Sequence, residues 1–258
     1  MSRSTLRVSR LTQIQQMLET DDVVTIGQLV ERLGVSEATV RRDLDALQRS
    51  GVIRRTHGGA ISAPLHELPY PARGARCVDE KRAIARAAAS LVNEGDTLFV
   101  GGGSTTLHLA AQLLDANVTV VTNSLPVATE LSRGRRGQVI VIGGTLRTPE
   151  QSMVGPRAVE AICSYRARIA FLGAPALDGQ HGLTADGDVE AATDLAFIDN
   201  AQRAVVLADH SKIGRVSTTH VVPLTAIDMV VTDTGAASEA IAELQAAGTK
   251  LLVAEVSS

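Results

Sequence analysis

The stretch TLFVGGGSTTLHLA, residues 97–110, is the part of the sequence whose residue types point most clearly to ligand binding. Four strand-forming residues lead into the glycines 101–103, which allow the backbone to turn sharply and to approach a ligand closely. Ser104, Thr105 and Thr106 then begin a helical pattern. Backbone N–H groups and hydroxyls at a helix N-terminus favour an anion such as a phosphate. The alternative is a close packing turn between a strand and a helix, with no ligand.

Two common phosphate-binding motifs are excluded at this loop. A P-loop would need G-K-[ST] after the glycines, and none follows. A dinucleotide fingerprint would need a glycine at position 106, which is Thr106. The loop therefore predicts an anion site outside the two main nucleotide-binding classes.

Further polar residues and glycines follow other apolar runs that we predict to be strands. Ligands of open α/β sheets bind beyond the carboxyl ends of the strands, so these residues are expected to converge on one crevice. Lys212 stands out because the chain has 22 Arg and only three Lys, and a lysine can contact a phosphate as a compact point charge. A surface lysine without a role is the alternative. The predicted effector residues are Gly102, Gly103, Ser104, Thr105, Thr106, Thr122, Asn123, Gly143, Gly144, Arg147, Asp178 and Lys212.

The elements that must position these residues alternate between helices and buried strands from Glu80 onward. Apolar runs predict strands at 97–100, 118–122, 138–142, 168–172, 203–208, 228–232 and 250–254. Helical patterns occur at 80–92, after Ser104, Ser124 and Gly155, and at 189–201 and 237–247. Strands that alternate with helices through short loops predict an α/β fold with a doubly wound, mostly parallel sheet.

The first 60 residues have a different pattern, with three helical segments within 6–50. Thr25 and Gln28 form a capping-box signature for a short helix that runs through Leu33. Gly34 and Val35 predict a tight turn, and Ser36 caps a third helix. Residues 52–60, VIRRTHGGA, predict one short strand with Gly58 and Gly59 as turn residues. Together these features predict a winged helix-turn-helix.

The second helix of such a unit enters the major groove of DNA, where Arg bridges guanine acceptors or phosphates and Thr contacts a thymine methyl or a phosphate. Basic residues on the wing suit backbone or minor-groove contacts. The alternative is a small helical subdomain with a solvated charged face, in which Arg42 and Arg49 pair with Asp43 or Asp45. The predicted DNA-binding residues are Ser36, Thr39, Arg41, Arg42, Arg49, Arg54, Arg55 and His57.

Composition and charge limit the classes of function. The 258-residue chain is 45% hydrophobic but only 2% aromatic, which suits a core of Val, Ile, Leu and Ala beneath parallel strands. Its net charge of −3 is divided between a basic N-terminal segment and an acidic remainder, which favours a polyanion partner for the former. Cys77 and Cys163 stand alone, and the six His show no metal-ligand spacing, so no metal site is expected. With no signal-peptide pattern and no convincing membrane span, a cytoplasmic protein without a membrane partner is expected.

The segment TIGQLVERLGVSEATVRRDLDALQRSGVIRRTHGGA closely resembles the DNA-binding segment of the DeoR (DeoR/GlpR) family of bacterial regulators. The later segments EKRAIARAAASLVNEGDT, GSTT, VVTNSLPVA, VIGGTLR, SMVGP, GLT and LADHSKIG are similar to that family's C-terminal sensor in the expected order. The resemblance implies a sensor similar to ribose-5-phosphate isomerase and coenzyme A transferase folds. It also implies that Ser104, Thr105 and Thr106 hold the phosphate of a phosphorylated sugar or related metabolite.

The chain departs from the family pattern at three places. Gly101 stands where relatives usually have Asp, and GAPALD, residues 173–178, keeps only Asp178 of the two acids in the usual G-A-D-G-I-D. Because the missing acids would face sugar hydroxyls, they indicate an atypical effector. His210 occupies a position that often holds Ser in the family.

We therefore predict a transcriptional regulator, a repressor of a carbohydrate-metabolism operon that its effector releases from operator DNA. The predicted regions are a DNA-binding domain at 1–60, a linker at 61–77 and an effector-sensing domain at 78–258. A homodimer or homotetramer is expected, because helix-turn-helix proteins generally read paired half-sites. No cofactor is expected.

The opposing hypothesis is a sugar-phosphate isomerase-like enzyme, which would need a carboxylate base and a polarising group. Its candidate residues are Asp178, Asp186, Asp188, Glu190 and Lys212. GAPALD lacks the paired acids that isomerases of this fold carry, and such enzymes have no appended DNA-binding module. We therefore expect no enzymatic activity.

Overall fold

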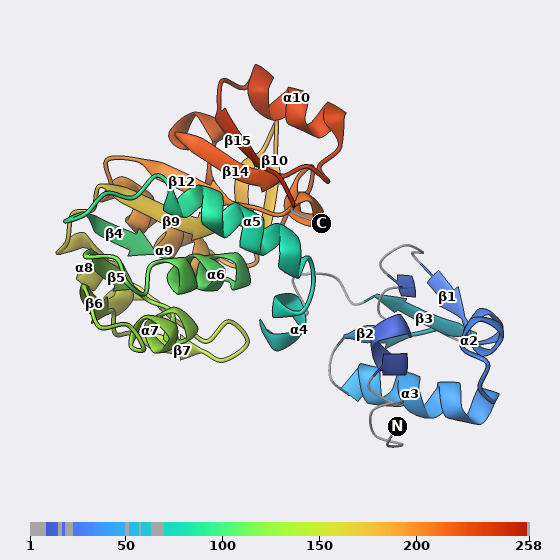
Figure 1. Cartoon of the computed structure of the whole chain (residues 1–258). Coiled ribbons are helices and arrows are strands. Elements are labelled where there is room, and N and C mark those ends of the chain that lie inside the picture. The colour runs from blue at the N-terminus through green and yellow to red at the C-terminus, as the bar shows by residue number, and fades with distance from the viewer. Residues whose placement is uncertain are drawn as a thin grey trace. The chain divides into compact units, whose positions relative to one another are not determined.

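The computed structural model describes residues 9–14, 17–18, 23–49, 52–56, 58–62 and 70–256. The chain divides into two compact units, Met1–Arg73 and Gly74–Ser258. Each unit has its own core, and each can be followed by its labelled elements in Figure 1.

The first unit contains the predicted helix-turn-helix. Residues 9–14 and 17–18 are helical, and the later elements are β1 (Val23–Thr25), α2 (Ile26–Leu33), α3 (Glu37–Arg49), β2 (Ile53–Arg55) and β3 (Gly59–Ser62). Apolar residues at helical spacing form the core, which includes the fully buried Ile14, Leu29, Val40 and Leu44. The predicted capping box is present, since Gln28 N donates to Thr25 Oγ1 and Thr25 N donates to Gln28 Oε1.

The wing differs from the single strand predicted for residues 52–60. It is an antiparallel sheet of order β1-β3-β2, and Gly59 lies within β3 instead of in a turn. A Cβ at Gly59 would lie 2.1 Å from the carbonyl oxygen of Val24, so only glycine allows β3 to approach β1 this closely. Strand β1 has three residues directly before α2, too few to give a recognisable alternation in the sequence.

The second unit is built on a seven-stranded parallel sheet of order β15-β14-β12-β9-β4-β5-β6. Strand β4 comes first along the chain, β5 and β6 extend the sheet from it to one edge, and the later four strands extend it to the other. The topological switch point therefore lies between β4 and β9. The strands are β4 (Thr97–Val100), β5 (Thr119–Thr122), β6 (Gln138–Val141), β9 (Ile169–Gly173), β12 (Ala204–Leu207), β14 (Met229–Asp233) and β15 (Lys250–Ala254).

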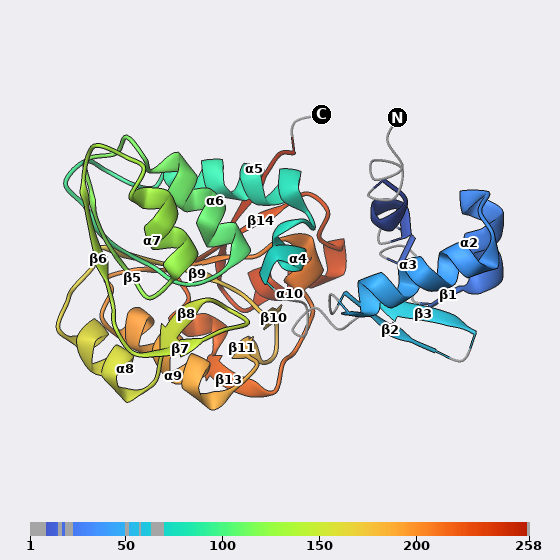
Figure 2. The ribbon, with the colours of Figure 1, turned by 90° about the horizontal axis from the view of Figure 1, so that it is seen from below.

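Helices cover both faces of this sheet, which confirms the doubly wound α/β class. On one face, α5 (Val78–Ala89), α6 (Ser104–Gln112) and α7 (Leu125–Leu131) pack on inward-facing residues such as Leu98 and Phe171. On the other face, α8 (Pro156–Cys163), α9 (Asp188–Asp199) and α10 (Ser238–Ala246) pack around Phe99 and Leu172. Figure 2 shows α5, α6 and α7 on the side of the sheet opposite to α8 and α9.

Several short elements were not predicted from the sequence. A hairpin joins β7 (Thr145–Arg147) and β8 (Ser152–Val154), and a small antiparallel sheet contains β10 (Ala176–Asp178), β11 (Gly182–Ala185) and β13 (Thr219–Val222). Helix α4 (Tyr70–Gly74) lies inside the segment 61–77 that was expected to be a linker. Strands of three or four residues expose too few alternating positions for a periodic pattern to mark them.

Candidate effector crevice and DNA-binding face

The glycine loop lies at the topological switch point of the sheet. The amide of Gly101 donates to the carbonyl of Phe171 on β9 at 2.9 Å. A Cβ at Gly103 would lie 3.7 Å from the Cα of Gly173, and a Cβ at Gly173 would lie 3.2 Å from the carbonyl oxygen of Gly102. The ends of β4 and β9 are thus in close backbone contact, and this is the position where open α/β sheets bind ligands.

The three hydroxyl residues after the glycines differ in what they can do. Gly103, with φ of 144°, is the N-cap of α6, and the N–H groups of the helix's first turn have no partner within the helix. Thr106 is fully buried and donates its hydroxyl to the carbonyl of Gly103 at 3.0 Å. Ser104 is partly exposed and Thr105 is buried at the start of the helix. Thr106 therefore shapes the loop, while Ser104, Thr105 and the first-turn amides remain the predicted anion-binding groups.

The β7–β8 hairpin closes over the end of β5. Asn123 Nδ2 donates to the carbonyl of Met153 at 2.9 Å, and the amide of Met153 donates to the carbonyl of Asn123 at 2.7 Å. A Cβ at Gly102 would lie 3.4 Å from the Cβ of Ser152, so the hairpin also borders the glycine loop. Asn123 Oδ1 is buried and has no hydrogen-bond partner among the residues described. A ligand donor would satisfy this acceptor.

Thr122 has a structural part in the same region. Its hydroxyl donates to the carbonyl of Val100 at 2.6 Å and accepts from the amide of Ser124 at 3.1 Å. The side chain is fully buried, and its hydrogen bonds join the ends of β4 and β5.

Arg147, on β7, forms an ion pair with Glu190 in the first turn of α9. Both side chains are mostly buried, at 30% and 16% exposure. The pair connects the hairpin to α9. Gly144 permits the hairpin to fold back, because a Cβ there would lie 2.9 Å from the carbonyl oxygen of Val154, whereas a Cβ at Gly143 would meet nothing within 4 Å.

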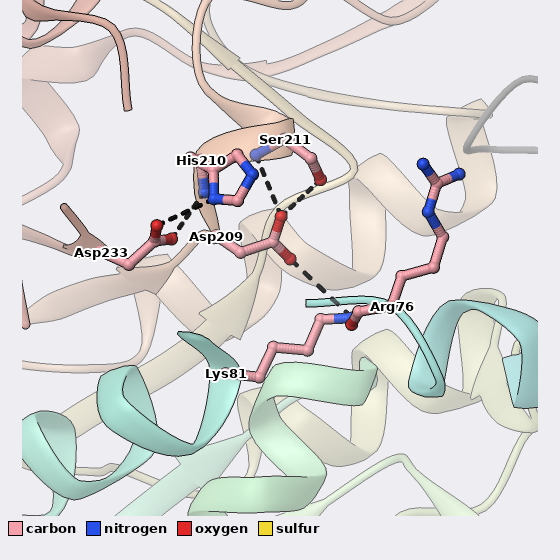
Figure 3. A network of polar contacts seen from close by, with 6 residues as sticks. All are labelled: Arg76, Lys81, Asp209, His210, Ser211 and Asp233. Carbon is pink, nitrogen blue, oxygen red and sulfur yellow. Dashed lines mark hydrogen bonds and ion pairs between the residues drawn. The ribbon is translucent and has the colours of Figure 1, made fainter. Parts of the chain in front are cut away.

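Lys212 lies in a 3₁₀ turn, His210–Lys212, that follows β12 and adjoins a buried polar network (Figure 3). The amide of Lys212 donates to the carbonyl of Asp209 at 2.9 Å. Lys81, in the first turn of α5, places its Nζ 3.9 Å from Asp209 Oδ2 and donates to the carbonyl of Arg76 at 2.7 Å. Two of the chain's three lysines therefore contact Asp209, Lys81 through its side chain and Lys212 through its backbone amide.

The charges of this network act on neighbouring groups. Burial and the Asp209 carboxylate raise the pKa of the Cys77 thiol to about 12, so this cysteine remains a neutral thiol. Burial, together with the charges of Lys81 and Arg82, holds the pKa of His108 on α6 below its ordinary value. These effects favour the neutral form of His108, one helical turn after the glycine loop.

Sequence reasoning missed Lys81, although its signal was present. The rarity of lysine that singled out Lys212 applies equally to Lys81. It was hidden because a lysine among Glu80, Arg82 and Arg86 reads as part of a solvated helix face. The structure shows instead that its side chain is only 4% exposed.

Asp178 was predicted to face the effector, and in the structure its Oδ1 takes part in a local turn. Oδ1 accepts from the amides of Gln180 and His181 at 2.9 Å and contacts His181 Nδ1 at 2.7 Å. Burial opposes ionisation, but these contacts outweigh it and lower the pKa of Asp178. The residue orders the turn between β10 and β11, and none of these contacts is with the glycine loop.

The arginine candidates on α3 are exposed, as a reading helix requires, and Thr39 is partly exposed. The helix-turn-helix turn uses Gly34 in the left-handed region, with φ of 63°. Ser36 and Thr39 share a hydroxyl–hydroxyl hydrogen bond of 3.0 Å at the start of α3. Arg42 is exposed and its Nε donates to the carbonyl of Ala38 at 3.2 Å, and Arg49 is exposed at the last turn.

Two other candidate arginines have partners within the unit. Arg41 pairs with Glu37 one turn earlier at 2.5 Å, an exposed contact that phosphate can readily replace. Arg55 pairs with Asp45 of α3 at 2.5 Å and is only 24% exposed, so it holds the wing against the helix. Arg54 is exposed on the same strand, and His57 lies outside the described residues.

Comparison with known proteins identifies both units. The family model described as "DeoR-like helix-turn-helix domain" matches residues 10–64, and that described as "DeoR C terminal sensor domain" matches residues 76–234. The chain is therefore a DNA-binding transcriptional regulator, and it belongs to the DeoR family.

Curated relatives cover nearly the whole chain. The transcriptional repressor AccR of Agrobacterium fabrum is 34% identical over 88% of this chain and 89% of its own length. The HTH-type transcriptional regulator GlpR of Haloferax volcanii is 34% identical over 94% of this chain and 96% of its own length. The glycerol-3-phosphate regulon repressor of Escherichia coli is 32% identical over 85% of this chain and 88% of its own length.

Among solved structures, ribose 5-phosphate isomerase A of Methanocaldococcus jannaschii aligns with 51% of this chain and 52% of its own, at 21% identity and a TM-score of 0.38. This partial likeness says nothing about chemistry. No helix within the described part of the chain is both long and apolar enough to cross a membrane. Nor do the described His, Cys, Asp and Glu side chains gather in threes that could hold a metal ion.

Proposed function

We propose that this regulator represses a carbohydrate-related operon in the cytoplasm and leaves its operator when a small phosphorylated sugar or related metabolite binds the second unit. The observation that carries the proposal is the glycine loop and helix N-terminus at the switch point of the sheet. One relative is named for the glycerol-3-phosphate regulon, which supports an effector of this chemical class.

In this proposal the phosphate sits against the first turn of α6, where Ser104, Thr105 and the backbone amides favour negative charge. Lys212 supplies a positive charge from the end of β12. On the other side, Asn123 Oδ1 accepts from a hydroxyl of the effector, and Arg147 is drawn from Glu190 toward the anion.

An effector changes DNA affinity only if it binds the DNA-competent and DNA-incompetent states unequally. Arg147 offers such a difference, because an anion in the crevice competes with Glu190 for the guanidinium. The described structure corresponds to the paired state, in which the β7–β8 hairpin is fastened to α9. Two copies of the chain, as a dimer or tetramer, would read the two half-sites of the operator.

The test uses a fluorescent DNA fragment taken from upstream of the protein's own gene, with binding followed by anisotropy. Ribose 5-phosphate, glucose 6-phosphate and glycerol 3-phosphate are each added, with the unphosphorylated compounds as controls. We expect at least one phosphorylated compound to release the DNA, and Thr105→Val to require a higher concentration of it. DNA binding that no compound alters would contradict the proposed sensor.

We also propose that the second unit has no catalytic role. Three of the carboxylates considered for an isomerase have structural partners that the effector does not displace. Asp178 accepts hydrogen bonds within its turn, Asp186 accepts from the hydroxyl of Ser217, and Asp188 accepts from the hydroxyl of Thr219. A general base must be free to take a substrate proton. Conversion of ribose 5-phosphate by the purified protein that Lys212→Ala abolished would overturn this proposal.

A further inference from the structure

We propose that His210 determines effector specificity, by contacting the part of the effector that is remote from its phosphate. This inference rests on the proposed sensor function of the same crevice. It assigns a ligand-binding role to a residue that lies outside the phosphate site at α6. The argument begins with the contacts that fix the ring.

The imidazole of His210 is held at Nδ1 by a buried carboxylate (Figure 3). Asp233, whose side chain has no exposed surface, accepts from the His210 amide through Oδ1 at 2.8 Å and contacts ring Nδ1 through Oδ2 at 2.8 Å. Oδ2 also accepts from the amide of Gly235 at 2.9 Å. Backbone and side chain of His210 are thus fixed by one carboxylate, which pre-orients the ring.

The glycine at position 235 is part of this fit. A Cβ there would lie 2.7 Å from His210 Nδ1 and 2.8 Å from Asp233 Oδ2. Any side chain at this position would therefore push the ring away from its carboxylate. The turn after β14 is shaped around the histidine.

The contact with Asp233 leaves the other ring nitrogen for a ligand. Because a carboxylate only accepts hydrogen bonds, the neutral imidazole is assigned its hydrogen on Nδ1, and Nε2 of that neutral ring has a lone pair. The side chain is 33% exposed, and none of the described residues hydrogen-bonds to Nε2. An oriented acceptor of this kind is suited to a hydroxyl group of a sugar or polyol.

His210 also lies beyond the carboxyl ends of the parallel strands, as the glycine loop does. It follows β12, which is two strands away from β4 and the glycine loop, with β9 between them. At about 4.8 Å per strand, the two chain segments are roughly 10 Å apart. The strand between them ends at Gly173, which has no side chain to separate them. An effector with its phosphate at Ser104 can therefore extend across Gly173 toward His210.

The neighbouring hydroxyl does not compete for the ring. Ser211 directs its hydroxyl to Asp209, so it forms no nucleophile–base pair with His210. The histidine and its aspartate are accordingly assigned to recognition and not to covalent catalysis.

The experiment measures binding to the full-length protein by calorimetry, for wild type, His210→Phe and Gly235→Ala. The probes are inorganic phosphate, ribose 5-phosphate, 2-deoxyribose 5-phosphate, glucose 6-phosphate and glycerol 3-phosphate. We expect the wild type to bind at least one of the organic phosphates more tightly than inorganic phosphate. His210→Phe should weaken the binding of that compound about tenfold, which corresponds to the loss of one hydrogen bond. The affinity for inorganic phosphate should stay unchanged.

Gly235→Ala keeps the imidazole but displaces it, and should cause a similar selective loss. If His210→Phe fails to fold, Gly235→Ala provides the same comparison. Unchanged affinity for every organic phosphate in a folded variant would overturn the inference. An equal loss of affinity for organic and inorganic phosphate would also overturn it, because that result indicates a structural role for His210. A wild-type protein that binds none of the five probes would instead refute the proposed sensor function and this inference with it.

Discussion

Lys81 Nζ lies 3.9 Å from Asp209 Oδ2, and the two side chains are 4% and 2% exposed. Lys81 also donates to the carbonyl of Arg76, and Asp209 accepts from the amide and the hydroxyl of Ser211. A buried charge is tolerated only when it has such partners. The pair therefore connects the beginning of α5 to the end of β12.

Replacing Lys81 by Met should destabilise the second unit strongly. The variant leaves the Asp209 carboxylate buried without its cation, a loss typically of about 3–5 kcal/mol in the free energy of unfolding. Denaturant unfolding measures the loss, and Lys250→Met, at an exposed lysine, is the matched control with an expected change under about 0.5 kcal/mol. Equal effects of the two substitutions would show that the buried pair contributes nothing.

The two adjacent glycines of the wing should respond differently to alanine. A Cβ at Gly59 would collide with the backbone of Val24 and Thr25, whereas a Cβ at Gly58 meets nothing within 4 Å. Gly59→Ala should lower the free energy of unfolding by at least about 2 kcal/mol and separate β1 from β3. The stability of Gly58→Ala should stay close to that of the wild type. Hydrogen exchange of the amides in residues 23–25 reports the change. Similar exchange rates in both variants would contradict the described pairing.

Arg42→Ala should remove sequence-specific DNA binding and leave the fold unchanged. Arg42 is exposed on α3 and contacts only the backbone of its own helix within the described contacts, so its loss exposes no buried group. Anisotropy titrations at two salt concentrations separate specific from non-specific binding. Arg82→Ala, at an exposed arginine of α5, serves as the control. Unchanged discrimination between operator and unrelated DNA would exclude Arg42 from base reading.

Asp194 on α9 should make stability depend on pH. Burial, with a further contribution from the Glu150 carboxylate, raises the pKa of Asp194 from 3.8 to about 7. A folded-state pKa above the unfolded value means that the stabilisation is complete below about pH 4 and is lost as the pH rises to about 7. Asp194→Asn should thus be more stable than wild type at pH 8, by roughly 1–2 kcal/mol after allowance for partial exposure, and similar at pH 4. Parallel pH profiles of the two proteins would refute this assignment.

The parallel sheet could be predicted from the sequence because each of its strands is a continuous apolar run between helical patterns, as in residues 97–100 and 204–207. The glycine loop was found for the same reason, since it directly follows such a run. The hairpin at 145–154 could not be predicted, because its strands are three residues long and are held by backbone contacts with Asn123.

Charged pairs between distant segments were equally hidden. Asp45 was considered as an intrahelical partner for Arg42 or Arg49, but the structure pairs it with Arg55 of the wing. Spacing along a helix shows which residues share its surface, and it contains no information about what a separate strand brings to that surface. The same limitation conceals His210 and Asp233, which become neighbours only because β12 and β14 are adjacent in the sheet.

The hydrogen bond from Lys81 to the Arg76 carbonyl has a consequence for the local stability of the second unit. It fixes the point at which the chain enters the second unit, because the bond comes from a lysine that is itself buried and neutralised. The start of the second unit can therefore open only by breaking a buried charged contact. Local unfolding from this end costs more free energy than the fraying of an ordinary chain terminus.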